Sequence, residues 1–196
     1  MRIDDKEFNI SKSDVILEAT LELVSELGLK GTTISQISKR AKLSPGIIYY
    51  YFNSKDEILH TLYRDLELAF IEAVNKKNPL SKPILECYKT LWLRTYNFGI
   101  ENPNALIFVE SYQNSIYYKD RISNGREQFL SRLQEKTSES IKSGELKPLP
   151  IEAIYAIVIR PAFELSKLKL AGIDFLYGTT IEEIASSICK SLLKTQ

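Results

Sequence analysis

A short stretch of the chain collects residues that suit contact with phosphates and with the edges of nucleic-acid bases. Residues 28–55 contain five basic residues and no acidic residue, and such a local positive charge favours a polyanion. Within this stretch, the small residues Ser44-Pro45-Gly46 are followed by the three phenolic hydroxyls of Tyr49-Tyr50-Tyr51. Hydroxyls, small side chains and backbone amides at a helix start can approach phosphates and base edges closely.

The helix before this stretch is predicted from the spacing of its apolar residues. Apolar side chains that recur every three or four residues predict a helix at about 13–27, which Ser13 or Asp14 would cap and Gly28 would end. Its solvated face is expected to carry Glu18, Glu22 and Glu26.

Two short helices follow, and capping residues mark their starts. Thr33 is expected to cap a helix at about 33–40, and Ser44 to cap another at about 44–52. Pro45 comes directly after Ser44 and is favoured at the first helical position, where its missing N–H has no partner to lose. Two short helices joined by a tight turn and followed by a longer helix form a helix-turn-helix, whose second helix enters the major groove of DNA.

We expect each contact to DNA to come from this stretch. The candidate DNA-binding residues are Thr33, Lys42, Ser44, Pro45, Gly46, Ile47, Tyr49, Tyr50, Tyr51 and Lys55. The side chains of Pro45, Gly46, Ile47, Tyr49 and Tyr50 are the candidates for reading bases, and hydroxyls and ammonium groups are the candidates for phosphates. The alternative is ordinary helix caps beside three solvent-exposed tyrosines.

The net charge of the whole chain does not reveal the local positive charge of residues 28–55. The 196 residues carry 26 Lys and Arg and 25 Asp and Glu, a formal net charge of +1. The first 27 residues hold three bases and seven acids, whereas residues 28–55 hold only bases. The acidic first helix is therefore expected to keep the affinity for non-specific DNA modest.

Composition argues against an enzyme. His60 is the single histidine, so catalytic sites that need imidazole as a base or metal ligand are improbable, and neither a cofactor nor a metal is expected. Cys87 and Cys189 lack CxxC spacing, which favours a reducing compartment. The polar N-terminus and the lack of a long apolar run predict a soluble, cytoplasmic protein.

Helical spacing continues through the rest of the chain and predicts an all-α fold of nine helices. A long helix is expected to open at Asn53 and Ser54, and a proline, Pro161, interrupts the eighth helix, which it would either kink or end. The remaining helices are predicted at about 81–100, 103–116, 120–143, 150–171 and 180–194.

The motifs between residues 13 and 62 resemble those of the tetracycline-repressor (TetR) family of bacterial transcriptional regulators. The matching residues are Ile16-Leu17-Glu18-Ala19, Leu27-Gly28, Gly31-Thr32-Thr33-Ile34, Ile37, Ala41, the run from Ser44 to Phe52, and Lys55. The resemblance implies that Thr33, Tyr49, Tyr51 and Lys55 touch phosphates and that Tyr50 varies with the operator. Ser38 and Lys42 depart from the family, which often has Ala and Gly there.

The resemblance also implies two domains, a DNA-binding domain at 1–55 and a domain for ligand binding and dimerisation at 56–196. Helices that surround a ligand cavity in the family carry aromatic residues here. The candidate ligand-binding residues are Trp92, Tyr96, Phe108, Tyr112, Phe129, Tyr155 and Phe163. An ordinary aromatic core is the alternative for each of them.

The last two helices, at about 150–171 and 180–194, are expected to form a homodimer interface. Residues 154–170 are apolar on more than one face, and the last helix has a single apolar stripe. We therefore expect a homodimeric repressor that binds a palindromic operator and is released by a small apolar or amphipathic effector. The alternative is a helical adaptor that has lost DNA binding.

Overall fold

The computed structural model describes residues 11–118 and 124–194, and helices make up most of these residues. Within them no strand forms, and the pairing of β type is an isolated antiparallel bridge between Leu146 and Leu193. None of the helices in these residues is long and apolar enough to cross a membrane. The prediction of an all-α fold is confirmed.

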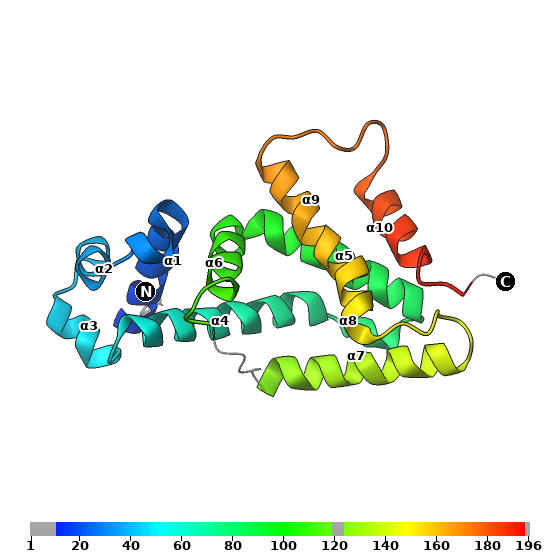
Figure 1. Cartoon of the computed structure of the whole chain (residues 1–196), viewed down its shortest axis with the longest axis horizontal. Helices are drawn as coiled ribbons and strands as arrows, with labels where there is room; N and C mark the ends of the chain where they lie inside the picture. Colours follow the sequence, from blue (N-terminus) through cyan, green and yellow to red (C-terminus); the bar gives the residue numbers. More distant parts are fainter. Residues whose placement is uncertain (1–10, 119–123, 195–196) are drawn as a thin grey trace, which may run out of the picture. The chain divides into compact units, whose positions relative to one another are not determined.

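The N-terminal helices match the predicted order (Figure 1). Their bounds are α1 Lys12–Gly31, α2 Ile34–Ala41, α3 Pro45–Tyr51 and α4 Lys55–Asn75. The helices α1, α2 and α3 pack against one another. Ile16, Ile37 and Ile48, one from each helix, are fully buried, and Phe52 is 5% exposed. Apolar burial therefore holds the three helices together.

The start of α1 lies earlier than predicted. The hydroxyl of Ser11 accepts a hydrogen bond from the backbone N–H of Asp14 at 3.1 Å, and the Asp14 carboxylate accepts one from the backbone N–H of Ser11 at 3.2 Å. The prediction that Ser13 or Asp14 caps the helix is wrong, because Ser11 is the cap. Its reciprocal capping box satisfies the backbone N–H groups of Ser11 and Asp14.

Gly28, which the sequence predicts to end the first helix, instead interrupts α1. Its backbone has φ 71° and ψ 170°, a conformation that favours glycine. The backbone N–H and the hydroxyl of Thr32 both donate to the Gly28 carbonyl, at 3.2 and 2.9 Å. The chain then makes one more helical turn, to Gly31.

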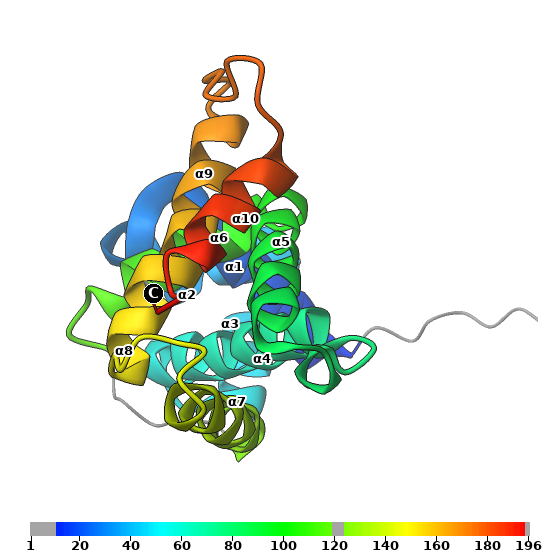
Figure 2. The same ribbon diagram turned by 90° about the vertical axis from the view of Figure 1, so that its right-hand side faces the viewer.

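The remaining helices differ widely in length, and most of them pack around α5 Ile84–Glu101. The others are η1 Pro79–Ser81, α6 Pro103–Gln113, α7 Asn124–Lys142, α8 Ile151–Ile154, η2 Tyr155–Ile159, α9 Arg160–Leu170 and α10 Ile181–Lys190. Helix α5 lies beside both α9 and α10 (Figure 2). Cys87 on α5 and Cys189 on α10 are free, buried thiols.

Pro161 neither ends the eighth predicted helix nor leaves it regular. The chain is helical from Ile151 to Leu170, but η2 is a π-helical turn between α8 and α9. The N–H of Arg160 donates to the carbonyl of Tyr155, five residues earlier. Proline has no N–H and its ring crowds the carbonyl four residues before it. The wider turn just before Pro161 accommodates both effects.

The described residues form two compact units. The first contains the described residues through Tyr63 together with the segment that begins at Ile107 and includes the second half of α6. The second begins at Arg64 and includes α5, α7 and the C-terminal helices. Helices α4 and α6 contribute residues to both units, so the domain division expected at residues 55 and 56 remains a prediction about function.

Candidate nucleic-acid interface

The turn between α2 and α3 is closed by a left-handed residue and a side-chain hydroxyl. Lys42 has φ 54° and ψ 35°, and its N–H donates to the carbonyls of Ser38 and Lys39. The N–H of Leu43 also donates to the Ser38 carbonyl, at 3.1 Å, and the Ser38 hydroxyl donates to the Leu43 carbonyl at 2.5 Å. Both departures from the family pattern therefore lie in this turn: Ser38 stabilises it, and Lys42 occupies a conformation that suits glycine.

Thr33 caps α2, as predicted, and its polar groups are engaged in the cap. Its hydroxyl accepts from the N–H of Gln36 at 3.3 Å and donates to the Gln36 side-chain oxygen at 2.9 Å. The same oxygen accepts from the N–H of Thr33 at 2.8 Å. A phosphate at this helix start would then meet the first-turn N–H groups that α-helices leave unpaired, and Thr33 orients them.

The first residues of α3 and its cap have small, exposed side chains. The hydroxyl of Ser44 accepts from the N–H of Ile47 at 3.4 Å, and Pro45 occupies the first helical position. Gly46 lies next to it in ordinary helical backbone, and the nearest atom to a β-carbon added there is the Ser44 hydroxyl at 3.8 Å. Neither conformation nor crowding within the chain therefore requires glycine at residue 46.

The three consecutive tyrosines of α3 lie outside the core, as predicted. The exposed fractions of Tyr49, Tyr50 and Tyr51 are 56, 83 and 40%, whereas their neighbour Ile48 is fully buried. The rings of Tyr50 and Tyr51 meet edge to face with centroids 5.1 Å apart. A large exposed aromatic group costs solvation free energy in isolation, so this arrangement favours a partner surface over the alternative of idle exposure.

Lys55, at the start of α4, already makes contacts within the first unit. Its ammonium donates to the Leu29 carbonyl at 2.5 Å and lies 5.6 Å from the centroid of the Tyr117 ring. Partial burial lowers the pKa of Lys55, and the neighbouring Asp56 opposes that shift. An ammonium has three donors, so the predicted phosphate contact remains open to the other two.

The candidate ligand-binding residues do not gather in one place. Trp92, Tyr96 and Phe129 are buried in the core of the second unit, and Phe163 packs against that core. The rings of Trp92 and Tyr96 stack with centroids 5.9 Å apart.

Phe108 and Tyr112 belong instead to the first unit, where they are buried and stack on each other. The Tyr112 hydroxyl donates to the Tyr117 carbonyl at 3.0 Å and lies 3.4 Å from Nδ1 of His60. The remaining candidate, Tyr155, is 43% exposed.

Neither of two hollows on the described surface is lined by these aromatic residues. One, of about 300 Å³, follows polar side chains of α7 from Ser131 to Lys142. The other, of about 130 Å³, lies along the turn after α9, from Lys169 to Leu176. Trp92, Tyr96 and Phe129 are buried in the second unit and Phe108 and Tyr112 in the first, whereas Phe163 packs against the core and Tyr155 is partly exposed.

The helices predicted to form the dimer interface leave apolar side chains exposed. Tyr155 and Ile157 are 43 and 42% exposed, and Leu170 is 45% exposed. The turn after α9 adds Ile173, at 50%, and Tyr177, at 88%. On α10, the predicted stripe divides. Ala185 is buried within the chain and Ile181, Ile184 and Ile188 are partly buried, whereas Leu192, also buried, lies past the end of α10.

The turn between α2 and α3, with open residues at the start of α3, defines the chain as a helix-turn-helix protein of the DNA-binding class. The family model described as bacterial regulatory proteins of the tetR family matches residues 16–62. The model of the tetracyclin repressor-like C-terminal domain matches residues 63–185. The chain belongs to the TetR family of helix-turn-helix transcriptional regulators, whose members bind DNA operators and typically form homodimers that respond to small molecules.

Relatives agree with this assignment. An HTH-type transcriptional regulator of Haemophilus influenzae is 26% identical over 154 residues, 79% of this chain and 81% of the relative. A fatty acid metabolism regulator protein of Bacillus subtilis is 26% identical over 134 residues, 67% of this chain and 69% of the relative. A crystal structure of a TetR family transcription regulator from Marinobacter aquaeolei shares the fold, with a TM-score of 0.81, 24% identity, and coverage of 94% of this chain and 96% of that chain.

Residues that support the interface were missed at the level of sequence. Gln36 completes the cap at Thr33, and the Thr-x-x-Gln spacing of a capping box was a signal for it. Arg40 binds two glutamates of α1. No local sequence pattern predicts this pairing, because Glu22 and Glu26 are 18 and 14 residues away from Arg40 along the chain.

Proposed function

We propose that the protein is a homodimeric repressor that binds a palindromic operator through α3 and is released by a small apolar or amphipathic effector. The observation that carries this proposal is the open start of α3, where Ser44, Pro45 and Gly46 precede the exposed Tyr49 and Tyr50. An operator-binding repressor must share a compartment with the chromosome, so we propose a cytoplasmic location.

The proposed DNA contacts divide by chemistry. Pro45, Gly46, Ile47, Tyr49 and Tyr50 would face base edges, because they occupy the start and the exposed side of the recognition helix. Phosphate contacts are proposed for Thr33, Lys42, Ser44, Tyr49, Tyr51 and Lys55. Lys42 is exposed in the turn, where its ammonium can reach a phosphate without passing the core.

The proposed dimer uses the helices at 150–171 and 180–194. Its support is the exposed apolar side chains of Tyr155, Ile157 and Leu170. The double variant Tyr155→Glu/Ile157→Glu is expected to be monomeric in sedimentation, because charge would be buried in the interface, and to lose operator affinity. As a control, Ile116→Glu changes an apolar residue that is 92% exposed in the other unit and should leave the dimer intact.

The effector site is proposed among the aromatic residues of the second unit. Trp92, Tyr96, Phe129, Phe163 and Tyr155 remain candidates, and an effector would have to open the packed core around them. Phe108 and Tyr112 would then serve the first unit, beside α4. The likeness to a fatty acid metabolism regulator makes long-chain acyl compounds the first class to screen by thermal shift, together with lipophilic cations.

Selection of bound fragments from random duplex DNA tests the proposal directly. The expected result is enrichment of a palindrome whose half-sites lie about one helical turn, roughly 34 Å, apart. Release of that palindrome by a compound from the screen would support the effector part. A failure to enrich any sequence with the intact dimer would instead favour the adaptor and overturn the repressor.

A further inference from the structure

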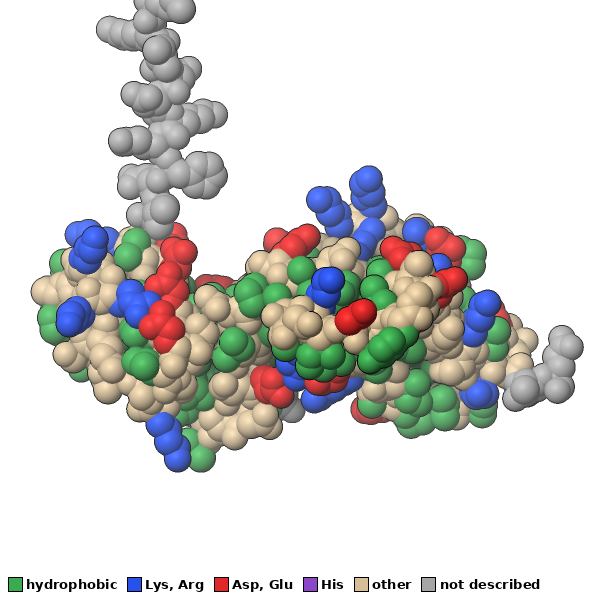
Figure 3. Space-filling view, turned by 90° about the horizontal axis from the view of Figure 1, so that it is seen from above, with side chains coloured by type: hydrophobic (Ala, Val, Ile, Leu, Met, Phe, Trp, Pro, Cys, Tyr) green, Lys and Arg blue, Asp and Glu red, His purple; other side chains and the backbone are tan. Residues whose placement is uncertain are grey.

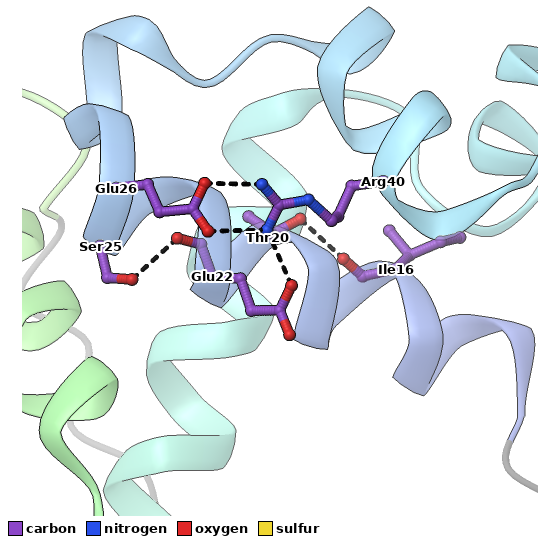
Figure 4. A network of polar contacts seen from close by, with 6 residues as sticks. All are labelled: Ile16, Thr20, Glu22, Ser25, Glu26 and Arg40. Carbon is purple, nitrogen blue, oxygen red and sulfur yellow. Dashed lines mark hydrogen bonds and ion pairs between the residues drawn. The ribbon is translucent and has the colours of Figure 1, made fainter.

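Arg40, near the end of α2, is held by two carboxylates of α1 (Figure 4). Its Nη1 donates to Glu22 Oε2 at 2.8 Å and to Glu26 Oε1 at 3.0 Å, and its Nη2 donates to Glu26 Oε2 at 2.6 Å. The contact with Glu26 is bidentate, a geometry that fixes the plane of the guanidinium as well as its position. We call Arg40, Glu22 and Glu26 the arginine clamp.

The clamp adds a contact to the acidic face of α1, which the sequence predicts to be solvated: the side chains of Glu22 and Glu26 are 43 and 52% exposed and also bind Arg40. Glu22 and Glu26 are four residues apart, so they lie on one face of α1 and can receive a single guanidinium between them. Hydrogen bonds from Arg40 lower the pKa of Glu26. Glu18, one turn earlier, is exposed as predicted. Acidic and basic side chains accordingly lie next to each other on the N-terminal helices in Figure 3.

The clamp holds the last turn of α2, directly before the turn that leads to α3. Arg40 is followed by Ala41 and then by Lys42, whose N–H donates to carbonyls of the last turn of α2. That last turn also accepts from Leu43 through the Ser38 carbonyl. Because α3 begins directly after this turn, fixing the end of α2 on α1 also fixes where α3 starts.

The clamp also changes the charge that DNA would meet. Two carboxylates surround one guanidinium, so the three side chains together carry a net negative charge at neutral pH. Non-specific binding to DNA depends mainly on the cations that a protein offers to phosphates. Because the guanidinium of Arg40 donates to carboxylates of α1, it adds little to the affinity for non-specific DNA.

We propose that Arg40 is a positioning residue and not a DNA contact: the arginine clamp orients the recognition helix and limits the affinity for non-specific DNA. This inference deepens the proposed DNA-binding function and rests on it. It makes Glu22 and Glu26 determinants of specificity, although they stand outside the helix-turn-helix. It also separates Arg40 from Lys42, which lies two residues away and is exposed.

The first experiment measures binding of the full-length protein to its selected operator and to an unrelated duplex of equal length over a salt series. We expect Arg40→Gln to weaken operator binding by about tenfold and to leave the salt slope on the unrelated duplex unchanged. The matched control is Lys42→Gln, for which that slope should fall by about 0.9 because one phosphate contact is lost. An equal fall with Arg40→Gln would overturn the proposal.

The second experiment releases Arg40 without removing it. Glu22→Gln/Glu26→Gln keeps side-chain size and frees the guanidinium, so we expect tighter binding to the unrelated duplex, a steeper salt slope and a lower ratio of operator to unrelated affinity. Glu18→Gln removes an acid of the same helix outside the clamp and should change the ratio less. An unchanged ratio in the double variant would show that the clamp does not limit non-specific binding.

Two controls keep the outcome clear. Circular dichroism and thermal unfolding show whether each variant folds, and if Arg40→Gln does not, Arg40→Lys keeps the charge and loses the bidentate fork. That variant is expected to weaken operator binding at an unchanged slope. Operator binding by the unaltered protein tests the proposed function by itself, so its absence would be told apart from a failure of the clamp.

Discussion

The recognition helix and the helix α5 use aromatic residues in opposite ways. Tyr50 on α3 is 83% exposed, whereas Trp92 on α5 is fully buried and stacks on Tyr96. On α3 the chain leaves much of the three tyrosine rings uncovered, and this exposure favours an external partner. On α5 the aromatic residues are explained by burial in the core, so their presence gives no information about an effector.

Glycine shows the same contrast. A β-carbon at Gly46 on α3 would meet the Ser44 hydroxyl at an ordinary contact distance of 3.8 Å, whereas a β-carbon at Gly99 on α5 would overlap the Ser166 side chain on α9. The first glycine is explained only by something outside the chain, and the second by close packing of two helices. Substitutions in the two regions should therefore separate DNA binding from stability.

The largest effect is expected from Trp92→Ala. Removal of a fully buried indole should lower the free energy of unfolding by about 3–5 kcal/mol, measured by urea denaturation. Trp92→Phe keeps an aromatic ring and removes the Nε1 donor, which has no hydrogen-bond partner, so its loss should be smaller. A loss below about 1 kcal/mol for Trp92→Ala would mean that this core is loosely packed, as a latent effector cavity requires.

Tyr50→Ala should act on binding alone. The free energy of unfolding is expected to change by less than about 0.5 kcal/mol, because the ring is exposed. Operator affinity should fall by roughly tenfold and the selected sequence should change, as for loss of a base contact. Ile116→Ala, which removes an apolar side chain that is 92% exposed and lies outside α3 and the proposed dimer helices, is the control. An unaltered selected sequence would remove Tyr50 from the base-reading residues.

Lys42→Gly should move stability and binding in opposite directions. Glycine relieves the left-handed backbone at residue 42, and after the greater entropy of the unfolded chain is counted, a gain of about 0.5–1 kcal/mol is expected. The salt slope of DNA binding should fall by about 0.9. Lys42→Asn tolerates the same conformation and serves as the uncharged control. A slope that stays constant in both variants would exclude the phosphate contact.

Gly46→Ala is expected to stabilise the fold slightly while it weakens operator binding. Alanine in regular helical backbone should raise the free energy of unfolding by about 0.5–1 kcal/mol, while the added methyl group weakens operator binding. Gly99→Ala should do the reverse and destabilise the fold. Operator binding that survives Gly46→Ala without change would mean that DNA does not approach the start of α3 closely.

Much of the fold follows from local patterns. The caps at Thr33 and Ser44 lie where the sequence predicts them, because a capping side chain bonds to a backbone N–H only two or three residues away. The sequence predicts Ser13 or Asp14 as the cap of α1, whereas the cap is Ser11, and Asp14 is its partner in the capping box. Errors of this kind move a boundary and leave the element in place.

The distribution of the aromatic residues could not be predicted in this way. Phe108 and Tyr112 share a helix with residues of the second unit but pack in the first, beside His60 and Tyr63. Periodicity shows that two rings share a helix face, and it does not show which helix they meet. That depends on contacts some fifty residues apart along the chain.

By itself, the sequence determined the helices, the helix-turn-helix and the exposed tyrosines of α3, because hydrogen bonds between near neighbours and apolar periodicity act within a few residues. Only the tertiary structure shows that Arg40 pairs with two carboxylates of α1 and is therefore not a free positive charge beside the turn. It also decided that Lys55 rests on the Leu29 carbonyl. Ion pairs and side-chain hydrogen bonds depend on distance in space, and the packing of α1 against α2 sets that distance for the clamp.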